Sequence, residues 1–586
     1  MKSFLKIFLA SLLALVVFSL VAFFIFLGLI SGLTTPEKVV TGQRAVLVLD
    51  LSKAYPEVAV QNPLKGLGGK ERYDVPALYD VVRLLKYAKA DSSVKGLYIK
   101  CGGNANSFGS SEEIRNAILD FKSSKKFVYA FGDVITQSGY AVANAADKIY
   151  CNPQGGVDWR GYAMQLAFLK GLLQKLEIEP QIFYAGKFKS ATEPLRETQM
   201  TEANKLQSIV LLNDLYGHFL TQTATARKID TATLHKYAIE SSIQFASDAL
   251  KYGLVDGLKY DDEVKEEIRA LVKAEQLDKI NFIDIDKYAQ VVDIKPITVG
   301  GDRIAVLYAT GDIIDGKGER DKIGSETYRN YIRKVRLDKN IKAIVLHINS
   351  GGGSALASEN IWRELTLARK DKPVVISFGD VAASGAYYLS CNADSIFAQP
   401  NTITGSIGVF SILPNMQKFF NNKLGVTFDG VKTATDADEL SIAKPLTESQ
   451  KRFMQNSVDS IYHTFKSRVA DGRKKSIEYI DSIGQGRVWS GSRGVELGLV
   501  DRIGGLSDAI ACAARMAKIT DYRLREYPAA QSLFDMLLGN YEQEAAAKAI
   551  EKEFGTEGIR MYRSLKSVKQ MVGSVQTRLP FEYTIE

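Results

Sequence analysis

The sequence predicts an α/β fold in which one βαβ domain occurs twice in tandem. Apolar runs of strand length alternate with segments of helical spacing over residues 40–525, as in βαβ units around a largely parallel sheet. One constant shift aligns residues 91–153 with 338–400 without a gap. Under this shift Phe131-Gly132-Asp133-Val134 falls on Phe378-Gly379-Asp380-Val381, so both halves carry the same local signals.

The expected elements follow the same order in both copies. In the first copy the expected strands are 45–50, 94–100 and 127–131, and the expected helices are 77–90 and 112–122. In the second copy the expected strands are 304–308, 341–348 and 374–376. Near the end of each copy, Gly253-Leu254-Val255-Asp256 is echoed by Gly498-Leu499-Val500-Asp501, which extends the duplication.

These patterns divide the chain into four parts. They are an N-terminus with an anchor helix (1–35), a first repeat (36–295), a second repeat (296–525) and a C-terminal extension (526–586). The extension has no counterpart in the repeats. Within it, residues 544–554 have the spacing of a charged amphipathic helix, which we expect to serve packing or assembly.

The composition is that of an ordinary folded protein, with 46% hydrophobic and 24% charged residues. A net charge of +8 is small for 586 residues, and no dense basic cluster has interleaved aromatics, so we expect no nucleic-acid partner. The four cysteines form no CxxC pair, and no His/Cys cluster has metal-ligand spacing. We therefore expect no metal and no cofactor, and the cysteines are too scattered to assign disulfides from the sequence.

The N-terminal segment 7–30 is uncharged, apolar and long enough to cross a bilayer as a helix. Lys2 and Lys6 precede it, which predicts a cytoplasmic N-terminus and places everything after residue 35 outside the cytoplasm. A cleavable signal peptide is the alternative, but Ser31-Gly32-Leu33 is a poor cleavage site. We expect a single-pass anchor that is not removed.

Ser384 stands at the centre of the most informative stretch, Phe378 to Tyr388. The buried strand 374–376 leads into a turn at Gly379-Asp380, and an apolar run of helical character follows the serine. A serine at such a junction is held with its hydroxyl exposed, at a helix N-terminus that favours negative charge. The simpler alternative is that Ser384 only caps a helix.

The two copies differ where chemistry is expected. Ser384 falls on Gln137 of the first copy, and Ser138 lies one position off. Conversely, the first copy contains Lys189, and the aligned position of the second copy is Ala434. One copy therefore holds a candidate nucleophile and the other a candidate base.

A serine nucleophile needs a base within hydrogen-bonding distance. Of the four histidines, His347 lies in a predicted strand and is most simply a strand side chain. A lysine serves only if burial lowers its pKa, because desolvation disfavours the charged form. Lys189, flanked by Phe188 and small residues, suits this role better than Lys187, which is the nearest alternative.

Two further motifs complete the predicted site. The loop Gly351-Gly352-Gly353 follows a parallel strand, and its backbone N–H groups, with that of Ser384 or Gly385, are suited to an oxyanion hole. Ser406, in a later run of small residues, is the candidate that orients the lysine amine. Taken alone, a glycine loop or a turn serine is as consistent with a simple turn as with a catalytic role.

Four motifs together resemble those of peptidase family S49, the signal peptide peptidase A (protease IV) family, in its long, duplicated, membrane-anchored form. They are Asn349-Ser350-Gly351-Gly352-Gly353, Gly379-Asp380-Val381-Ala382-Ala383-Ser384-Gly385-Ala386-Tyr387-Tyr388, Thr404-Gly405-Ser406-Ile407-Gly408 and Lys187-Phe188-Lys189-Ser190-Ala191-Thr192-Glu193-Pro194. The resemblance covers residues 40–525. In one respect the chain departs from it: Gly351 stands where the family usually has proline, and we expect the Gly352 donor to survive in a looser loop.

The resemblance implies a crotonase/Clp-protease-like fold and a Ser-Lys dyad, with Ser384 as nucleophile, Lys189 as base, and Gly352 and Gly385 as oxyanion donors. It also implies a homotetramer in the bacterial cytoplasmic membrane, with its catalytic domains on the extracytoplasmic side. The implied substrates are cleaved signal peptides and other apolar peptides. Two alternatives stay open: a crotonase-like acyl-CoA enzyme, which would bind CoA thioesters, and an inactive membrane scaffold, which would not react with a serine-directed probe.

Overall fold

A computed structural model of the chain describes residues 2–33, 41–58, 75–292, 301–318, 322–438, 440–528 and 571–579. Within this part, the first half of the chain forms a six-stranded parallel sheet in the order β6-β4-β3-β2-β1-β7. Its strands are β1 (Ala45–Asp50), β2 (Val94–Lys100), β3 (Phe127–Ile135), β4 (Lys148–Val157), β6 (Gly257–Leu258) and β7 (Phe282–Asp284).

Helices cover this first sheet and connect its strands. They are α2 (Leu78–Ala90), α3 (Phe108–Lys122), α4 (Gln137–Ala143), α7 (Glu202–Arg227), α8 (Thr231–Ile239), α9 (Ala246–Lys251), α10 (Asp261–Val272) and α11 (Ile285–Val291). The strands read as nearly continuous apolar runs because both faces of the sheet are covered.

The second half builds a corresponding eight-stranded sheet, mainly parallel, with the main order β17-β15-β13-β11-β8-β19; off this path β14 pairs with β13, and β18 pairs with β14. Its strands are β8 (Arg303–Thr310), β11 (Ile341–Ser350), β13 (Val374–Ala383), β14 (Ser395–Ala398), β15 (Ile403–Gly405), β17 (Val488–Ser490), β18 (Arg502–Ile503) and β19 (Arg523–Tyr527). Its helices are α12 (Ser325–Leu337), α13 (Ala355–Asp371), α14 (Gly385–Ser390), α15 (Glu448–Arg473), α16 (Ile477–Ile483), α17 (Gly491–Glu496) and α18 (Leu506–Met516).

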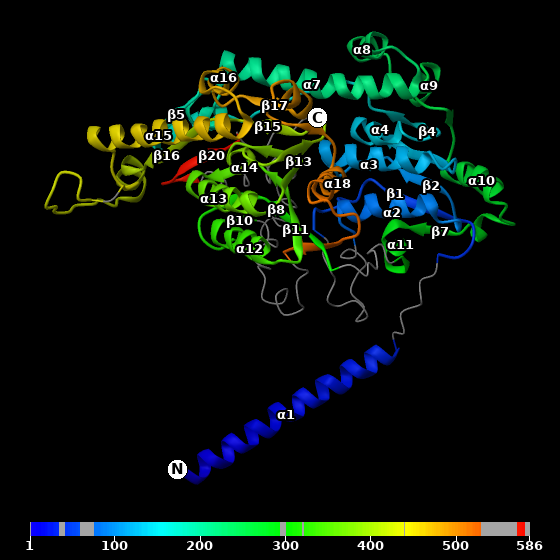
Figure 1. The fold of residues 1–586 in the computed structure, drawn as a ribbon, viewed down its shortest axis with the longest axis horizontal. Coiled ribbons are helices and arrows are strands. Elements are labelled where there is room, and N and C mark those ends of the chain that lie inside the picture. Colours follow the sequence, from blue (N-terminus) through cyan, green and yellow to red (C-terminus); the bar gives the residue numbers. More distant parts are fainter. Residues whose placement is uncertain are drawn as a thin grey trace.

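The duplication expected from the sequence is visible element by element. β2 and β3 begin at residues 94 and 127, and β11 and β13 begin at 341 and 374, the same constant shift that aligns the sequences. α7 and α15 are each 26 residues long, and each is capped by a threonine hydroxyl, Thr201 and Thr447. Figure 1 shows the two sheets side by side, with α7 lying along the top of the molecule.

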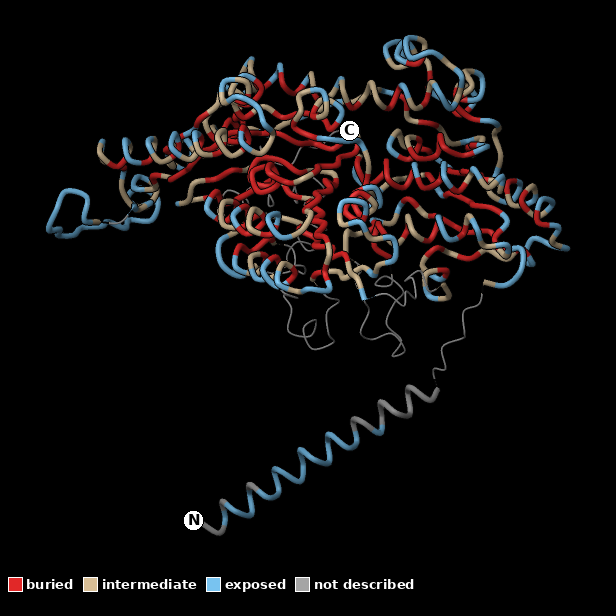
Figure 2. The backbone as a smooth tube through the Cα atoms, in the orientation of Figure 1, coloured by how far each residue is buried: buried red, intermediate tan, exposed pale blue. Residues whose placement is uncertain are grey.

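A third sheet joins distant parts of the chain, in the order β10-β9-β12-β20-β16-β5. Its strands are β10 (Lys322–Gly324), β9 (Asp312–Ile314), β12 (Gly352–Ser354), β20 (Val575–Arg578), β16 (Val409–Asn415) and β5 (Glu179–Ala185). β5 comes from the first repeat and β20 from the C-terminal extension. Figure 2 shows that the buried residues concentrate along the strands, while the peripheral helices turn exposed surface outward.

The first helix, α1, spans Lys2–Leu33. Among the residues that the structure describes, no helix has both the length and the hydropathy needed to cross a membrane. The transmembrane anchor over 7–30 therefore stays a prediction. The repeat boundary near 290–300 lies largely outside the described residues, and the helix expected at 544–554 lies wholly outside them.

Candidate active site

Ser384 lies between β13 and α14 in a strained backbone conformation. Its φ of 55° and ψ of −114° are values that non-glycine residues rarely adopt. Its N–H donates to the carbonyl of Gly405 at 2.8 Å, and its carbonyl accepts the N–H of Tyr388 at 2.7 Å. Ser384 is fully buried, so the exposed hydroxyl expected from the sequence is wrong, and its side chain makes no capping hydrogen bond to α14, which leaves the hydroxyl available to another partner.

That partner is Lys189, which the third sheet brings from the first repeat. β5 pairs antiparallel with β16, so that Ala185 lies opposite Val409, and the chain then turns at Gly186 toward the short 3₁₀ helix Ser190–Thr192. Lys189 Nζ lies 2.9 Å from Ser384 Oγ, although 195 positions separate the two residues in the sequence. Both residues belong to the same chain.

The Lys189 side chain is enclosed, with an exposed fraction of 1%. Two glycines make room for it: a Cβ on Gly486 would lie 2.6 Å from Lys189 N, and one on Gly408 would lie 3.1 Å from Lys189 Cδ. Burial lowers the pKa of Lys189 well below the ordinary lysine value of 10.5. A buried amine of this kind is suited to hold a free electron pair near neutral pH.

Ser406 supplies two more oxygen atoms to the amine. Its Oγ lies 3.1 Å and its carbonyl oxygen 3.4 Å from Lys189 Nζ. The serine has a positive φ of 52°, and its N–H donates to the carbonyl of Arg487 at 2.7 Å, which fixes this turn. The contact expected between Ser406 and the lysine is thus present.

The other candidates lie elsewhere. Lys187 is exposed, and its Nζ lies 5.8 Å from the Phe188 ring centroid. The ring of His347 is within hydrogen-bonding distance of Glu57 at 2.8 Å and Ser377 at 3.1 Å, as expected of a strand side chain with a buried polar partner. Ser138 is exposed on the first repeat.

The glycine loop runs beside the nucleophile. Gly352 has a φ of 100°, and a Cβ there would lie 2.7 Å from the backbone nitrogen of Gly385. The backbones of the two glycines therefore approach each other closely, as a shared oxyanion site requires. The Gly352 N–H donates to Ser350 Oγ at 3.1 Å in this structure.

Strand β20 of the C-terminal extension lies in the gap between β12 and β16. It runs antiparallel to both, with Thr577 opposite Gly353 and Gln576 opposite Phe410. The Thr577 carbonyl oxygen lies 2.1 Å from where a Cβ on Gly352 would sit, next to the Gly385 nitrogen. The chain's own C-terminal segment therefore runs past the serine as an extended strand.

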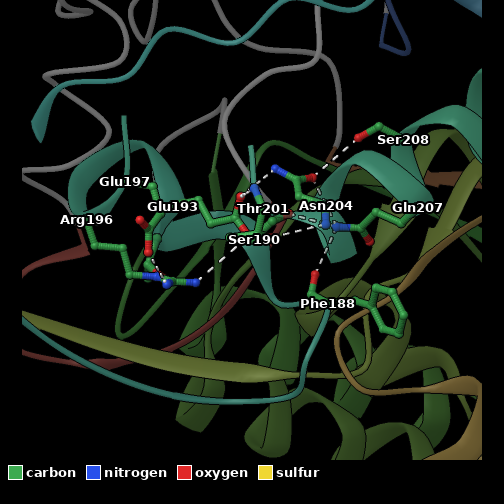
Figure 3. Close-up of polar contacts among 10 residues, drawn as sticks. Phe188, Ser190, Glu193, Arg196, Glu197, Thr201, Asn204, Gln207 and Ser208 are labelled. Carbon is green, nitrogen blue, oxygen red and sulfur yellow. Dashed lines mark hydrogen bonds and ion pairs between the residues drawn. The ribbon is translucent and has the colours of Figure 1, made fainter. Parts of the chain in front are cut away.

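A polar cluster follows Lys189 in the chain, formed by the 3₁₀ helix, α6 (Glu193–Arg196) and the first turns of α7 (Figure 3). The Glu193 carboxylate accepts from Thr201 Oγ1 at 2.6 Å and from Asn204 Nδ2 at 2.8 Å. Gln207 Nε2 donates to Ser190 Oγ at 2.9 Å. Glu193 falls inside a motif read from the sequence, whereas Gln207 lies in the second turn of α7, where no local signal marks it.

No group of metal ligands occurs among the residues that the structure describes. Cys101, Cys151, Cys391 and Cys512 are all buried and free.

The fold and the site define a serine-type peptidase, and comparison with known proteins supports this class. The model of peptidase family S49 matches residues 120–275 and 366–520, one match in each repeat. The chain belongs to peptidase family S49.

Curated relatives agree with this assignment. "Protease 4" of Salmonella typhi is 35% identical over 517 residues, which cover 84% of this chain and 82% of the relative. "Serine protease SPPA, chloroplastic" of Arabidopsis thaliana is 32% identical over 438 residues, 74% of this chain and 64% of the relative. Among solved structures, a point mutant of ClpP1 from Listeria monocytogenes covers 35% of this chain and 94% of its own at 15% identity, with a TM-score of only 0.24.

Proposed function

We propose that the protein is a membrane-bound serine endopeptidase with a Ser384–Lys189 dyad, which degrades cleaved signal peptides and other apolar peptides. The observation that carries the proposal is the 2.9 Å separation between Ser384 Oγ and a lysine amine that is almost fully buried. A hydroxyl next to a neutral amine is a pair suited to nucleophilic catalysis.

The reaction begins when Ser384 Oγ attacks the peptide carbonyl carbon and its proton passes to Lys189 Nζ. The carbonyl oxygen becomes an oxyanion, for which the N–H groups of Gly352 and Gly385 are the proposed donors. The C–N bond then breaks, and the Lys189 ammonium returns its proton to the leaving amine. Water, deprotonated by the same amine, hydrolyses the acyl-enzyme and restores Ser384.

An extended substrate would pair with β12 and β16 as a strand, at the position that β20 takes here. Backbone pairing of this kind selects peptides by their extended conformation more than by their amino-acid sequence. Apolar peptides fit the proposal because an N-terminal anchor over 7–30 would hold the enzyme at the bacterial cytoplasmic membrane, where signal peptides are released. A homotetramer with its catalytic domains on the extracytoplasmic side completes the proposal.

The test compares hydrolysis of an apolar peptide by the wild type, Ser384→Ala, Lys189→Ala and Lys187→Ala. We expect the first two variants to lose at least a thousandfold in kcat and Lys187→Ala to keep activity within about twofold. A fluorophosphonate probe should label the wild type at Ser384. Activity retained by Lys189→Ala would reject the dyad, absence of labelling and hydrolysis would favour a scaffold, and tight binding of a CoA thioester would favour an acyl-CoA enzyme.

A further inference from the structure

We infer that Gln207 is a positioning residue, which holds the Lys189 backbone in register with Ser406 and so keeps the amine on the nucleophile. The inference rests on the proposed Ser384–Lys189 dyad. Gln207 is fully buried on the inner side of α7, and both ends of its side-chain amide are engaged.

One end of the Gln207 amide holds the residues on either side of the lysine. Nε2 donates to the carbonyl of Phe188 at 3.0 Å and to the hydroxyl of Ser190 at 2.9 Å (Figure 3). Lys189 itself lies in a tight turn, where its N–H donates to the Gly186 carbonyl at 3.1 Å. Through its two neighbours, Gln207 therefore fixes the point from which the lysine side chain starts.

The other end of the amide holds the strand behind Ser406. Gln207 Oε1 accepts the N–H of Val488, in β17, at 3.3 Å. The preceding residue, Arg487, accepts the Ser406 N–H through its carbonyl at 2.7 Å. Val488 also pairs with Gly405 across β15 and β17.

These contacts close a ring around the amine. It runs from Lys189 through its flanking residues to Gln207, then through β17 to Ser406, and returns across the 3.1 Å contact between Ser406 Oγ and Lys189 Nζ. The lysine side chain is long and has several rotatable bonds, so its backbone alone does not fix the position of Nζ. The ring of contacts fixes both the start of the side chain and the position of its amine. A displacement of about 1 Å at a reacting group can cost on the order of a hundredfold in rate.

A purely structural role for Gln207 is the competing explanation, because a buried amide also stabilises any fold by satisfying backbone groups. The two roles differ in what they predict for the lysine. If the ring opens, water reaches the amine, its pKa rises toward the ordinary lysine value, and the pH at which activity rises moves upward. A structural role alone would change the unfolding temperature and leave this pH dependence unchanged.

The test uses Gln207→Met, which keeps the length of the side chain and removes both ends of the bridge, in the full-length protein. We expect kcat to fall about 10- to 100-fold with KM within about twofold, and the rising limb of the pH–rate profile to move to higher pH. Ser208→Ala is the matched control. It removes a neighbouring buried hydroxyl, which donates at 3.3 Å to Asn204 Oδ1, an acceptor that Gln207 Nε2 also contacts at 3.3 Å, and it leaves the residues beside Lys189 untouched.

Two results would overturn the inference: a pH–rate profile for Gln207→Met that superimposes on that of the wild type, or an equal change in Ser208→Ala. If Gln207→Met does not fold, Gln207→Asn, one methylene shorter, is measured in the same way against the same criteria. Ser384→Ala and Lys189→Ala are assayed in parallel. If Lys189→Ala stays active the proposed dyad fails, whereas if both are inactive and Gln207→Met behaves as wild type only the positioning role fails.

Discussion

At the scale of single residues, the buried amine of Lys189 sets a conflict between function and stability. Burial lowers the pKa of Lys189 in the folded protein, while in the unfolded chain the amine keeps its ordinary value of 10.5. The unfolded chain therefore binds a proton that the native site resists. Stability at this position falls as the pH decreases from the unfolded pKa toward the lowered native pKa.

It follows that Lys189→Met stabilises the protein while abolishing activity. Each unit by which burial lowers the native pKa is worth about 1.4 kcal/mol below that pKa, and methionine fills similar space without a charge. Thermal unfolding at pH 7 should show a higher Tm for Lys189→Met than for the wild type. The exposed Lys187→Met is the control and should leave Tm unchanged. A lower Tm for Lys189→Met would contradict the claim that the buried amine destabilises the folded protein.

Gly352 and Gly351 differ in the space that each leaves for a side chain. A Cβ on Gly352 would meet the Thr577 carbonyl oxygen at 2.1 Å and the Gly385 nitrogen at 2.7 Å, and the residue has a positive φ. A Cβ on Gly351 would meet only the Leu579 side chain, at 3.6 Å or more. The two neighbouring glycines are therefore a matched pair for testing the proposed oxyanion site.

We expect Gly352→Ala to lower kcat by about a hundredfold or more, because the methyl group fills the space in which the oxyanion would form. Gly351→Ala should keep activity within about threefold. Steady-state kinetics on one apolar peptide compares the two, and circular dichroism checks that both remain folded. Equal activities of the two variants would argue against Gly352 as a donor.

At the scale of elements, β20 and the proposed substrate compete for one place in the third sheet. β20 is held by backbone pairing on both sides, by the Leu579 N–H donating to the Gly351 carbonyl at 2.8 Å, and by an ion pair between Arg578 and Asp312 at 2.7 Å. A peptide that pairs with β12 and β16 must first displace it. Weakening β20 should therefore favour the peptide.

Arg578→Ala and Asp312→Ala should each lower KM, by up to about fivefold, because an ion pair that is partly exposed is worth up to about 1 kcal/mol. The two effects should not add, since both substitutions remove the same pair. Deleting residues 571–586 should lower KM further. If all three variants keep the KM of the wild type, substrates do not enter along β20.

Ser384 and Lys189, the two central residues of the candidate site, were predictable because their signals in the sequence are local or repeated. Ser384 follows a buried strand and a turn, and comparison of the two copies isolates both it and Lys189. The pairing of β5 with β16 and the position of β20 were not predictable, because a short strand sequence, such as the four residues of β20, does not reveal which distant strand it joins. Gln207 was missed for a related reason: its partners Phe188 and Val488 come together only in the folded chain.

At the scale of the whole molecule, the site depends on how the two repeats dock, because each repeat supplies one member of the proposed dyad. A polar cluster joins them near the nucleophile strand. Ser110 of the first repeat donates to the Asp380 carboxylate through both its N–H, at 2.8 Å, and its hydroxyl, at 2.9 Å. Asn349 Nδ2 donates to Glu57 at 2.8 Å and to Asp380 at 3.1 Å, so it links both sides.

Within this cluster, Glu57 of the first repeat pairs with His347 of the second at 2.8 Å. Burial disfavours both charges, but the mutual attraction outweighs it: the pKa of Glu57 is lowered and that of His347 is raised. The contribution of Glu57 to the free energy of unfolding is present above the pKa that Glu57 has in the unfolded chain, and it is lost as the pH falls through the lowered pKa of the folded protein. The His347 contribution is present below its unfolded pKa and is lost as the pH rises through its raised pKa.

A double-mutant cycle with Glu57→Gln and His347→Gln should therefore show a pH-dependent coupling energy across the repeat interface. Near pH 6 each single substitution should cost on the order of 3 kcal/mol, because it leaves a buried charge unpaired, and the double substitution should cost less than the sum. The coupling should shrink as His347 deprotonates at alkaline pH, while Ser377, Glu113, Asp380 and Tyr308 stay as neighbours of the ring in every variant. Denaturant unfolding between pH 6 and pH 9 measures this coupling energy.

Because docking of the repeats sets the distance from Lys189 to Ser384, the single variants should also lose kcat in parallel with stability. A coupling energy of zero at pH 6 would show that the pair does not join the repeats.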